Sequence, residues 1–426
     1  MEKIENQKGI KEDDLSLFIL EVLDSFPYAR KILVLFPDYT RIDFTNKIAP
    51  KIINKFEDSI IHFLNACGTH RAMIGAEFNK KLGIDINEPR VKFINHNFSN
   101  PLNLATIGYI PKELVSSKTD EQLKEDINIT INKLIFSNYD LIIAISGTLP
   151  HEASGYSGGL KIFLPGIAGS QVTDLFHWAA ALVGIPKIIG KEDNYARDII
   201  NEVARIIFDN INVPLYSFNM VNIEIGSEAI PIGLYVDKGY EGFLNTYKQA
   251  ANASSNVHIK YIEKPLEKVV QVIPSYYDEV WLAGKGSYKL QKPGVMTEGG
   301  ELIIYGPHIN CFHSNPQIES DIISVGYHCK EYFLNKLKKG VSASKNVVAH
   351  VINVTGPGTF DPLTNQEKLH FKISLATAIS EEDCKRVGLG YRDPNTIKEY
   401  DYKSPTKLWI KEGGKYLFDI KRNELI

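Results

Sequence analysis

Short apolar runs, each followed by a cluster of polar residues, recur along the first part of this chain. Residues 32–36 read Ile-Leu-Val-Leu-Phe, and residues 141–146 read Leu-Ile-Ile-Ala-Ile-Ser. Runs rich in β-branched residues, without polar alternation, are typical of strands that are buried on both faces of a sheet. The same pattern predicts strands at residues 59–64 and 91–95.

Apolar residues spaced three and four apart predict helices between these strands. The clearest are residues 13–24 and 194–211, followed by residues 240–251. Residues 111–137 are charged and carry apolar positions at helical spacing, so we expect them to be helical too. Residues 215–236 read as a β-hairpin. Strands that alternate with helices favour an α/β fold with a largely parallel sheet.

A polar stretch with a proline at residues 261–265 indicates a change of domain. Beyond it, apolar runs predict strands at residues 278–283, 301–305 and 347–354. We therefore expect two α/β domains, each with a mainly parallel sheet, and an active site in the cleft between them. The predicted ranges are 1–264 for the N-terminal domain, 265–403 for the C-terminal domain, and 404–426 for a C-terminal segment that can return to the first domain.

Composition narrows the range of functions. The 426 residues carry 48 Lys and Arg against 51 Asp and Glu, a net charge of −3, without a long run of like charge. This balance argues against nucleic acid or an acidic membrane surface as a partner. The apolar runs are too short to span a membrane, and the polar N-terminus does not resemble a signal peptide. Four scattered cysteines indicate reduced thiols, so we expect a cytoplasmic protein with a small-molecule ligand.

The most unusual stretch runs from residue 150 to residue 177, directly after one of the predicted strands. It reads Pro-His, then Gly-Tyr-Ser-Gly-Gly-Leu-Lys, then Pro-Gly and finally His. Such glycines suit a backbone that turns sharply or comes close to a ligand. The spacing is neither that of a Walker A loop nor that of a dinucleotide fingerprint. His151, Lys161 and His177 are therefore candidates for a site of another kind.

Two more predicted strands end in residues that carry chemistry. Asp38, Thr40 and Arg41 follow the strand at 32–36, and His70 follows the strand at 59–64. In an open α/β sheet, ligands bind beyond the carboxyl ends of the strands, where such loops converge. The planar fork of an arginine suits a carboxylate or a phosphate. We expect these loops to meet the stretch that begins at residue 150.

Together these motifs resemble the nickel-dependent lactate racemase family. The family carries Asp-x-Thr-Arg after an early strand and, later, Pro-His, Gly-Tyr/Phe-Ser-Gly-Gly-x-Lys, Pro-Gly and His. This chain matches the second motif at Pro150-His151, residues 155–161, Pro165-Gly166 and His177, and the first at residues 38–41.

The resemblance implies a cofactor, the nickel pincer nucleotide, which is a pyridinium mononucleotide whose two thiocarbonyl arms and ring carbon hold nickel. It would be attached covalently to Lys161, with His177 completing the nickel coordination. The resemblance also implies cofactor-biosynthesis enzymes as partners. The resemblance further implies that His70 and His151 are the catalytic acid and base. It also implies that Asp38, Thr40 and Arg41 contact the cofactor and that Arg41 contacts the substrate as well.

The resemblance is weaker in the second domain. The family has a substrate-binding Gln and Lys three residues apart, and the same spacing falls here on Lys289 and Lys292. A lysine in place of the glutamine favours a larger or doubly anionic acid. The alternative interpretation is a pair of solvated lysines on a helix surface. We find no counterpart of the family's later substrate-pocket tryptophan, since Trp409 lies too near the C-terminus.

The chemistry explains why a cofactor is needed. Histidine exists in both protonation states near neutral pH, so two histidines facing one substrate suit racemisation. One positioned general base accelerates a reaction roughly 10²–10⁴-fold, which lowers the activation free energy by about 3–5 kcal/mol. Enzymes typically lower it by about 8–23 kcal/mol, so two histidines alone are not enough. The α-hydrogen of a hydroxy acid is a poor acid, so its removal as hydride requires an acceptor.

Three functions are compatible with these residues. The resemblance favours a racemase or epimerase of a 2-hydroxy acid, lactate-like or larger. A second possibility is a Schiff-base lyase that uses Lys161 with His70 and His151, because lysine is also the Schiff-base residue. A third is a non-catalytic protein that binds or carries the nucleotide cofactor. The presence of both His70 and His151 argues against the third, since a carrier needs only Lys161 and His177.

Overall fold

The structure is a computed structural model of the chain, and it describes all residues except 86–87, 120, 122, 226–227, 338–343 and 422–426. The described chain divides into two compact units. Unit 1 comprises Met1–Phe176 and Glu192–Val257, and unit 2 comprises His177–Lys191 and His258–Ile426. The division falls inside helix α5 (Ser170–Val183), so that His177 belongs to unit 2.

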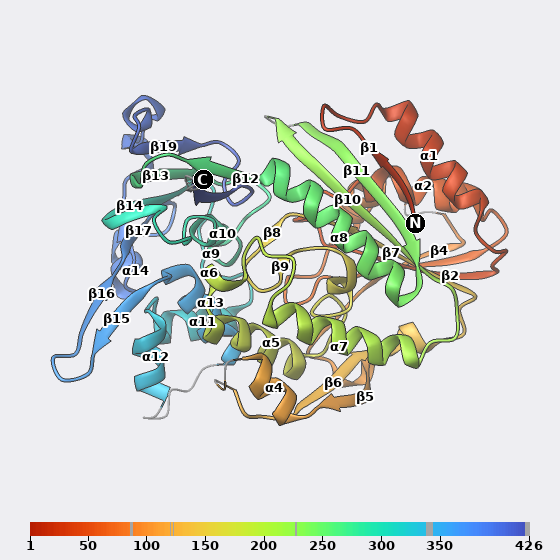
Figure 1. Ribbon diagram of the computed structural model, residues 1–426, viewed down its shortest axis with the longest axis horizontal. Helices are drawn as coiled ribbons and strands as arrows, with labels where there is room; N and C mark the ends of the chain where they lie inside the picture. Colours follow the sequence, from red (N-terminus) through yellow and green to blue (C-terminus); the bar gives the residue numbers. More distant parts are fainter. Residues whose placement is uncertain (86–87, 120, 122, 226–227, 338–343, 422–426) are drawn as a thin grey trace, which may run out of the picture. The chain divides into compact units, whose positions relative to one another are not determined.

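Unit 1 is built around a seven-stranded sheet in the order β1-β11-β10-β7-β2-β3-β4 (Figure 1). The five strands from β10 to β4 run parallel, while β11 is antiparallel to both of its neighbours. The strands are β1 (Glu2–Glu5), β2 (Lys31–Phe36), β3 (Ile60–Asn65), β4 (Val91–Asn95), β7 (Leu141–Gly147), β10 (Leu215–Ile225) and β11 (Glu228–Lys238). The four predicted strands and the hairpin of this unit are thereby confirmed.

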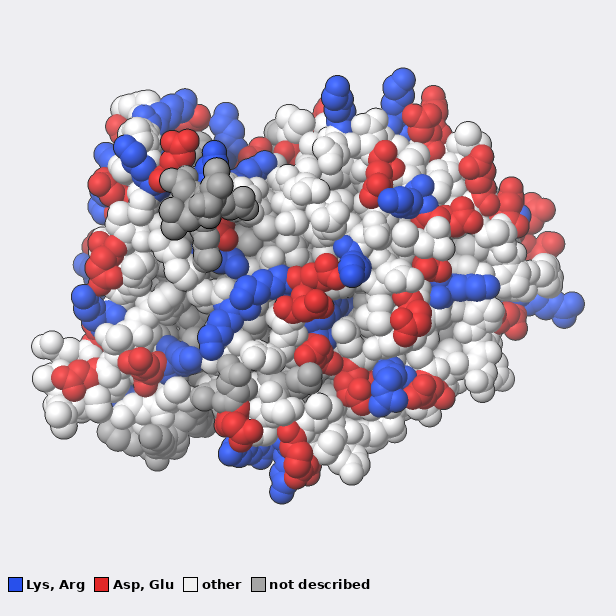
Figure 2. Space-filling model, viewed as in Figure 1, with Lys and Arg blue, Asp and Glu red and all other residues white. Residues whose placement is uncertain are grey.

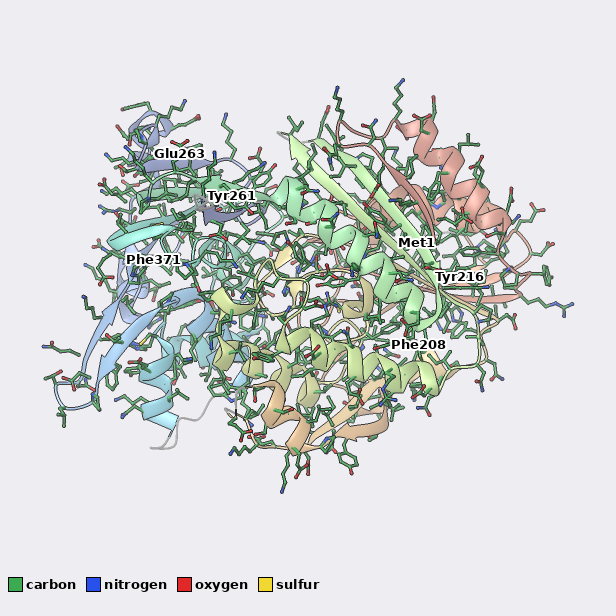
Figure 3. All side chains as sticks on the ribbon, in the orientation of Figure 1. Met1, Phe208, Tyr216, Tyr261, Glu263 and Phe371 are labelled. Atoms are coloured by element: carbon green, nitrogen blue, oxygen red, sulfur yellow. The ribbon has the colours of Figure 1, made fainter. Side chains whose placement is uncertain are left out.

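The central strands of unit 1 are apolar because they are covered on both sides. Residues 32–36 of β2 and 141–145 of β7 are all buried, as expected for strands inside a parallel sheet. The helices of this unit are α1 (Glu12–Asp24), α2 (Thr45–Lys55), α3 (Gly75–Leu82), α4 (Lys112–Lys118), α7 (Tyr195–Asp209) and α8 (Gly239–His258). Phe208 of α7 is labelled in Figure 3. Its ring packs against the rings of Tyr240 and Phe243 of α8.

Unit 2 contains a five-stranded sheet in the order β18-β17-β14-β13-β19, and every pair in it is parallel. Its strands are β13 (Leu266–Val272), β14 (Met296–Gly306), β17 (Phe371–Thr377), β18 (Gly390–Tyr391) and β19 (Lys407–Ile410). A separate pair joins β12 (Ile259–Ile262) to β20 (Leu417–Ile420). The C-terminal strands β19 and β20 therefore pair within unit 2. Both units have the expected α/β character with largely parallel sheets.

Short helices accompany the sheet of unit 2. They are α6 (Ile185–Ile188), α9 (Val280–Ala283), α10 (Lys285–Tyr288), α11 (Pro316–Val325), α12 (Lys330–Leu337), α13 (Lys345–Thr355) and α14 (Glu381–Arg386), and a hairpin is formed by β15 (Gly358–Asp361) and β16 (Gln366–Leu369). The segment His177–Lys191 is held in this unit partly by the Lys330 side chain, whose Nζ donates to the Leu182 carbonyl at 2.9 Å.

Two predicted strands of the second half are helices. Residues 347–354 lie in α13, where every residue from 346 to 355 is buried. A helix that is buried on all sides is apolar at every position, so its sequence resembles that of a buried strand. Residues 280–283 form α9. The first strand of the five-stranded sheet is β13, which was not predicted because its polar residues interrupt the apolar run.

The prediction of a helix over residues 111–137 is also wrong for much of that range. Helix α4 ends at Lys118, and residues 127–132 form β6, which pairs with β5 (Leu104–Ile110). The sequence of β6 alternates isoleucine with asparagine and threonine, which is a period of two rather than of 3.6. Residues 120 and 122 lie outside the described part of the chain.

Charged side chains of both signs are interspersed on the face shown in Figure 2. Among the helices of the described residues, none combines the length and the apolar character that a membrane crossing needs. Three of the four cysteines, Cys67, Cys329 and Cys384, are buried, and all four are free thiols.

Candidate functional site

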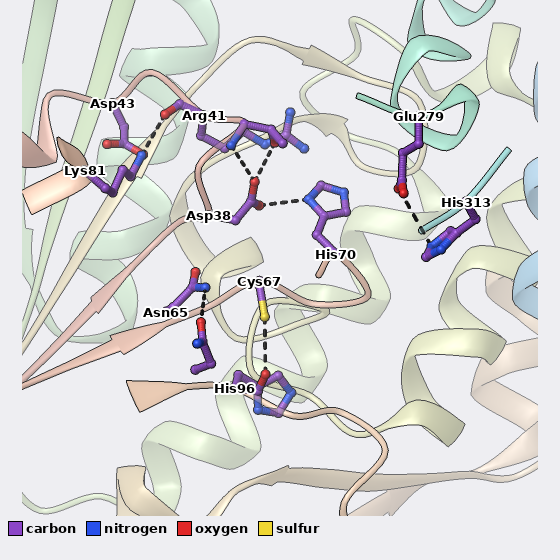
Figure 4. Close-up of polar contacts among 12 residues, drawn as sticks. Asp38, Arg41, Asp43, Asn65, Cys67, His70, Lys81, His96, Glu279 and His313 are labelled. Carbon is purple, nitrogen blue, oxygen red and sulfur yellow. Dashed lines mark hydrogen bonds and ion pairs between the residues drawn. The ribbon is translucent and has the colours of Figure 1, made fainter. Parts of the chain in front are cut away.

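The loop after β2 holds a buried carboxylate, Asp38, whose two oxygens are both engaged. Its Oδ1 accepts hydrogen bonds from the Thr40 backbone N–H at 2.8 Å and from the Thr40 hydroxyl at 2.5 Å. Its Oδ2 lies 3.0 Å from Nδ1 of His70 (Figure 4). Burial raises the pKa of Asp38, but His70, Arg41 and the Thr40 hydrogen bond outweigh it and hold this pKa well below its usual range. Asp38 is therefore ionised at neutral pH.

The loop after β3 turns so that His70 faces this carboxylate. The turn closes through a hydrogen bond from the His70 N–H to the Cys67 carbonyl at 3.0 Å, and Gly68 adopts a positive φ of 57° within it. Because Asp38 is ionised, it binds the protonated Nδ1 of His70. The lone pair of a neutral His70 is then on Nε2.

Lys81 of α3 anchors the β2 loop from the other side. Its Nζ donates to the Arg41 carbonyl at 2.6 Å and to Asp43 Oδ2 at 2.7 Å (Figure 4). The Arg41 backbone N–H in turn donates to the Asp38 carbonyl at 3.2 Å. The loop that carries Asp38 and Arg41 is thus tied to the body of unit 1.

The chain after β7 forms a tight hairpin that carries His151. Its two short strands are β8 (Pro150–His151) and β9 (Gly155–Tyr156). The Ala153 N–H donates to Nδ1 of His151 at 3.1 Å, and Oε2 of Glu152 lies 3.5 Å from the same nitrogen. His151 is buried, with 6% of its surface exposed.

The glycines that follow this hairpin are required by packing. Gly158 has a positive φ of 85°, and a Cβ at this position would lie 2.3 Å from the Thr148 hydroxyl and 2.6 Å from the Asn219 side-chain oxygen. A Cβ at Gly159 would lie 2.9 Å from Cβ of Tyr247. Of the two roles that the sequence left open for these glycines, the sharp turn in close contact with the protein is the one observed at both positions.

Lys161 lies one helical turn after the glycines, in the 3₁₀ turn η3 (Gly159–Ile162), against which helix α7 packs. Burial and, after it, the charges of Arg41 and Arg197 lower the pKa of Lys161 to about 7, against the opposing charges of Glu152 and Asp38. These charges come from the β2 loop, the β8–β9 hairpin and α7. The structure therefore brings Asp38, Arg41 and His70 together and sets Lys161 within the electrostatic reach of the first two.

Arg197 and Glu152 are two residues of this region that sequence reasoning missed. Arg197 is 2% exposed, donates to the Tyr156 carbonyl at 2.8 Å and lies over the Tyr247 ring at 3.6 Å. It reads in the sequence as one more charge on an amphipathic helix. The position of Glu152 next to His151 was a visible signal, but adjacent side chains usually point apart.

The predicted nickel ligand, His177, lies on α5 and belongs to unit 2. Its charge, together with those of His313 and Lys285, contributes to lowering the pKa of His350, although burial is the main cause. His350 stacks on Trp281 with ring centroids 4.1 Å apart. In the described residues, no three His, Cys, Asp or Glu side chains gather as a metal site.

The two predicted substrate lysines differ in burial. Lys289 is 2% exposed, whereas Lys292 is half-buried. The alternative of two solvated lysines is therefore wrong for Lys289. Two more lysines of unit 2 are buried and flank one aromatic ring: Lys285 and Lys415 lie over Tyr277 at 4.7 Å and 5.6 Å from its centroid. Neither was predicted.

Trp409 is part of the core of unit 2. It packs against the rings of Tyr305 and Tyr402, with centroids 5.8 Å and 6.1 Å away. These contacts give Trp409 a packing role in unit 2.

Comparison with known proteins finds a related domain in the first half of the chain. Residues 21–184 match the family model of the lactate racemase N-terminal domain. A curated lactate racemase from Thermoanaerobacterium thermosaccharolyticum is 30% identical over 146 residues, which are 33% of this chain and 31% of that protein. The aligned segment therefore spans about a third of the length of that relative.

Two solved structures match nearly the whole chain. The crystal structure of a protein from Thermotoga maritima is 50% identical, with a TM-score of 0.94 over 98% of this chain and 100% of that one. The lactate racemase apoprotein from Thermoanaerobacterium thermosaccharolyticum is 18% identical, with a TM-score of 0.64 over 96% of this chain and 93% of that one, a likeness of fold. The matched segment and the shared fold lead to one conclusion: residues 21–184 are a domain of the lactate racemase N-terminal family, and the chain has the fold of the lactate racemase apoprotein.

Proposed function

We propose that this protein is a racemase or epimerase of a 2-hydroxy acid that works with a lysine-tethered nickel pincer nucleotide. The observation that carries the proposal is the pairing of His70 with the ionised Asp38 at 3.0 Å, within the same strand-end region as a lysine whose pKa is lowered to about 7. The match of residues 21–184 to the lactate racemase N-terminal domain supports a racemase-type reaction. The substrate and the mechanism are the parts that we propose.

The chemistry of the donor set fits the cofactor. A lysine with a pKa of about 7 is neutral in about half of the molecules at pH 7, and the neutral amine is the form that makes a covalent bond. Lys161 would therefore hold the nucleotide covalently, and His177 would be its nickel ligand. When bound, the cofactor would supply a site that accepts a hydride from the substrate and returns it.

The residues of the chain would handle the carboxylate and the protons. Arg41, Lys289 and Lys292 would bind the substrate carboxylate, and the buried Lys289 would also suit a second anionic group. His70 would take the hydroxyl proton on Nε2, and Asp38 would stabilise the resulting imidazolium. His151 would exchange a proton with the product of opposite configuration. In this mechanism Asp38 acts through His70. The contacts of Asp38 and Thr40 with the cofactor, expected from the sequence, stay predictions.

The proposal is tested on protein co-expressed with the cofactor's biosynthetic enzymes. We expect intact-mass spectra to show an adduct on the wild-type protein and none on Lys161→Ala, metal analysis to find nickel, and a chiral assay to detect interconversion of at least one 2-hydroxy acid. Lactate, malate, 2-hydroxyglutarate and sugar acids form the first panel. An adduct that persists in Lys161→Ala, or loaded protein that converts none of these acids, would contradict the proposal.

A second function, a Schiff-base lyase, is favoured by the same low pKa of Lys161, because a neutral amine also attacks ketones. Borohydride treatment in the presence of a 2-keto acid separates the two functions. Trapping of the keto acid on Lys161, together with the absence of a cofactor adduct, would favour the lyase.

A further inference from the structure

A buried arginine of unit 1, Arg197, carries a charge that no carboxylate balances. It lies in the first turn of α7 and is 2% exposed. Among the described residues no carboxylate forms an ion pair with it, and its Nε and Nη1 have no hydrogen-bond acceptor there. A buried charge without a counter-charge costs free energy, because burial removes its hydration. Arg197 therefore indicates a role other than stability.

Two contacts hold the guanidinium of Arg197 against the segment that leads to Lys161. Its Nη2 donates to the Tyr156 carbonyl, just before the glycines, at 2.8 Å. Its Cζ lies 3.6 Å from the centroid of the Tyr247 ring, a stack that suits the planar fork. Tyr247 in turn covers Gly159, where a Cβ would lie 2.9 Å from Cβ of Tyr247. Gly159 begins the 3₁₀ turn that carries Lys161, so the charge is fixed beside that turn.

An arginine suits this place better than a lysine. Its guanidinium stays charged at every pH at which an amine titrates, whereas a buried lysine loses its own proton. We propose that Arg197 is a positioning residue of Lys161: from α7 it holds a permanent positive charge beside the turn that carries the amine, and so keeps that amine in its neutral, nucleophilic form. This inference rests on the proposed function, in which Lys161 is the point of attachment.

Four charged groups act on the amine of Lys161, from three elements. Burial is the main cause that lowers its pKa to about 7, and the charges of Arg41 and Arg197 add to it. Asp38, from the same loop as Arg41, and Glu152, from the β8–β9 hairpin, raise this pKa. A neighbouring cation favours the unprotonated amine, because like charges repel. Without Arg197, one cation would face two carboxylates, and the pKa of Lys161 would rise.

The stability of an Arg197 variant separates this role from a purely structural one. The Tyr156 carbonyl also accepts a hydrogen bond from the Ser154 hydroxyl at 2.8 Å, so it keeps a partner when the arginine is replaced. An apolar side chain of similar length also removes the cost of the buried charge. We therefore expect such a variant to fold. A residue that served only the fold would behave in the opposite way, since its loss would lower stability.

The test uses Arg197→Met in cofactor-free protein, with Arg197→Lys as the conservative variant. Reductive methylation with formaldehyde and cyanoborohydride across a pH series, followed by peptide mass spectrometry, gives the rate at Lys161 relative to the exposed Lys385. We expect the relative rate at pH 7 to fall about three- to tenfold in Arg197→Met, a rise of about half to one unit in pKa. The denaturant midpoint should not fall. Arg197→Lys should lie between the two, because its charge is partly lost on burial.

Arg205→Met is the matched control. Arg205 lies on the same helix but is exposed and pairs with Glu202 and Asp209. This variant should leave the methylation of Lys161 unchanged. The role of Arg197 would be overturned by a relative rate in Arg197→Met within twofold of the wild type, by an equal change in Arg205→Met, or by failure of Arg197→Met to fold.

A second readout concerns the attachment itself. In protein co-expressed with the cofactor's biosynthetic enzymes, intact-mass spectra should show a smaller adduct-bearing fraction for Arg197→Met than for the wild type. Equal fractions would contradict a role of Arg197 in attachment. Absence of any adduct on the wild type, with the methylation change still present, would instead count against the proposed function alone.

Discussion

His70 of unit 1 and His350 of unit 2 lie in opposite environments. In unit 1, His70 faces the ionised Asp38 at 3.0 Å. In unit 2, His350 lies between the hydroxyls of Tyr288 and Tyr327, at 3.4 Å and 3.3 Å, and stacks on Trp281. Burial is the largest of the effects that hold the pKa of His350 well below its usual range, and burial also lowers the pKa of His313 to about 4.

This difference shows that burial alone does not make a histidine a proton carrier. Burial keeps a ring among neutral hydroxyls and an indole uncharged, and the neighbouring positive charges act in the same direction. A ring beside a carboxylate that is itself held ionised can gain and lose a proton near neutral pH. We therefore expect His70 to act on protons, and His350 to contribute packing and hydrogen bonds.

The largest expected effect on kcat comes from replacing His70, and the replacement of His350 is the comparison. His70→Asn keeps an N–H near the position of Nδ1, so Asp38 remains paired, but it removes the base. We expect kcat of the loaded enzyme to fall about 10²–10⁴-fold with little change in stability. His350→Phe should leave kcat within tenfold and lower the free energy of unfolding by about 1–3 kcal/mol, since two buried hydroxyls lose a partner.

Chiral assays and denaturant titrations measure both quantities on both variants. The comparison would be broken if His350→Phe lost as much activity as His70→Asn, or if His70→Asn retained a tenth of the wild-type rate.

The lowered pKa of Lys161 is a second difference in charge that can be measured. Because its pKa is about 7, the neutral fraction of its amine rises through pH 7 and is nearly complete by pH 9. An exposed lysine, with a pKa near 10.4, has about 10³-fold less neutral amine at pH 7. We expect reductive methylation of cofactor-free protein, followed by peptide mass spectrometry, to modify Lys161 with a midpoint near pH 7.

Lys385, an exposed lysine of unit 2, serves as the internal reference for that measurement. A rate at Lys161 that rises only above pH 9, in parallel with the reference, would show that its surroundings do not lower the pKa.

The smallest expected effect concerns backbone packing in the two units. Gly158 of unit 1 and Gly184 of unit 2 both have positive φ, but a Cβ at Gly184 meets nothing within 4 Å. Gly184→Ala should therefore cost only the strain of the backbone, about 1–2 kcal/mol. Gly158→Ala adds a clash with Thr148 and Asn219, and we expect it to cost at least about 1 kcal/mol more.

Denaturant unfolding of the two variants gives the difference directly. Equal losses of stability would mean that the glycine-rich loop tolerates a side chain. In that case its glycines would serve the approach of a ligand instead of packing.

Much of the fold could be predicted because its signals are local. The strands β2 and β7 lie inside a parallel sheet, so their sequences are continuously apolar and need no tertiary information to be recognised. Residues 347–354 defeated the same reasoning, since a helix buried on all sides has the same composition as a buried strand. Strand β13 was missed because its polar residues broke the apolar run.

The candidate site divides in the same way. Asp38, His70 and His151 were recognisable because each follows a strand of the sheet within a few residues, and Lys161 because it follows a cluster of glycines. The pairing of Asp38 with His70 spans 32 residues, and the burial of Lys289 depends on segments far from it in the chain. Such contacts leave no periodic trace in the sequence.

By itself, therefore, the sequence determined which residue types stand at the ends of which strands, because strand order along the chain and local apolar patterning are one-dimensional properties. Only the tertiary structure decided how those residues are charged and which nitrogen of each ring carries the proton. Protonation depends on burial and on partners that fold in from elsewhere: the Asp38 carboxylate for His70, the turn of Ala153 for His151, and the charges of Arg41 and Arg197 for Lys161.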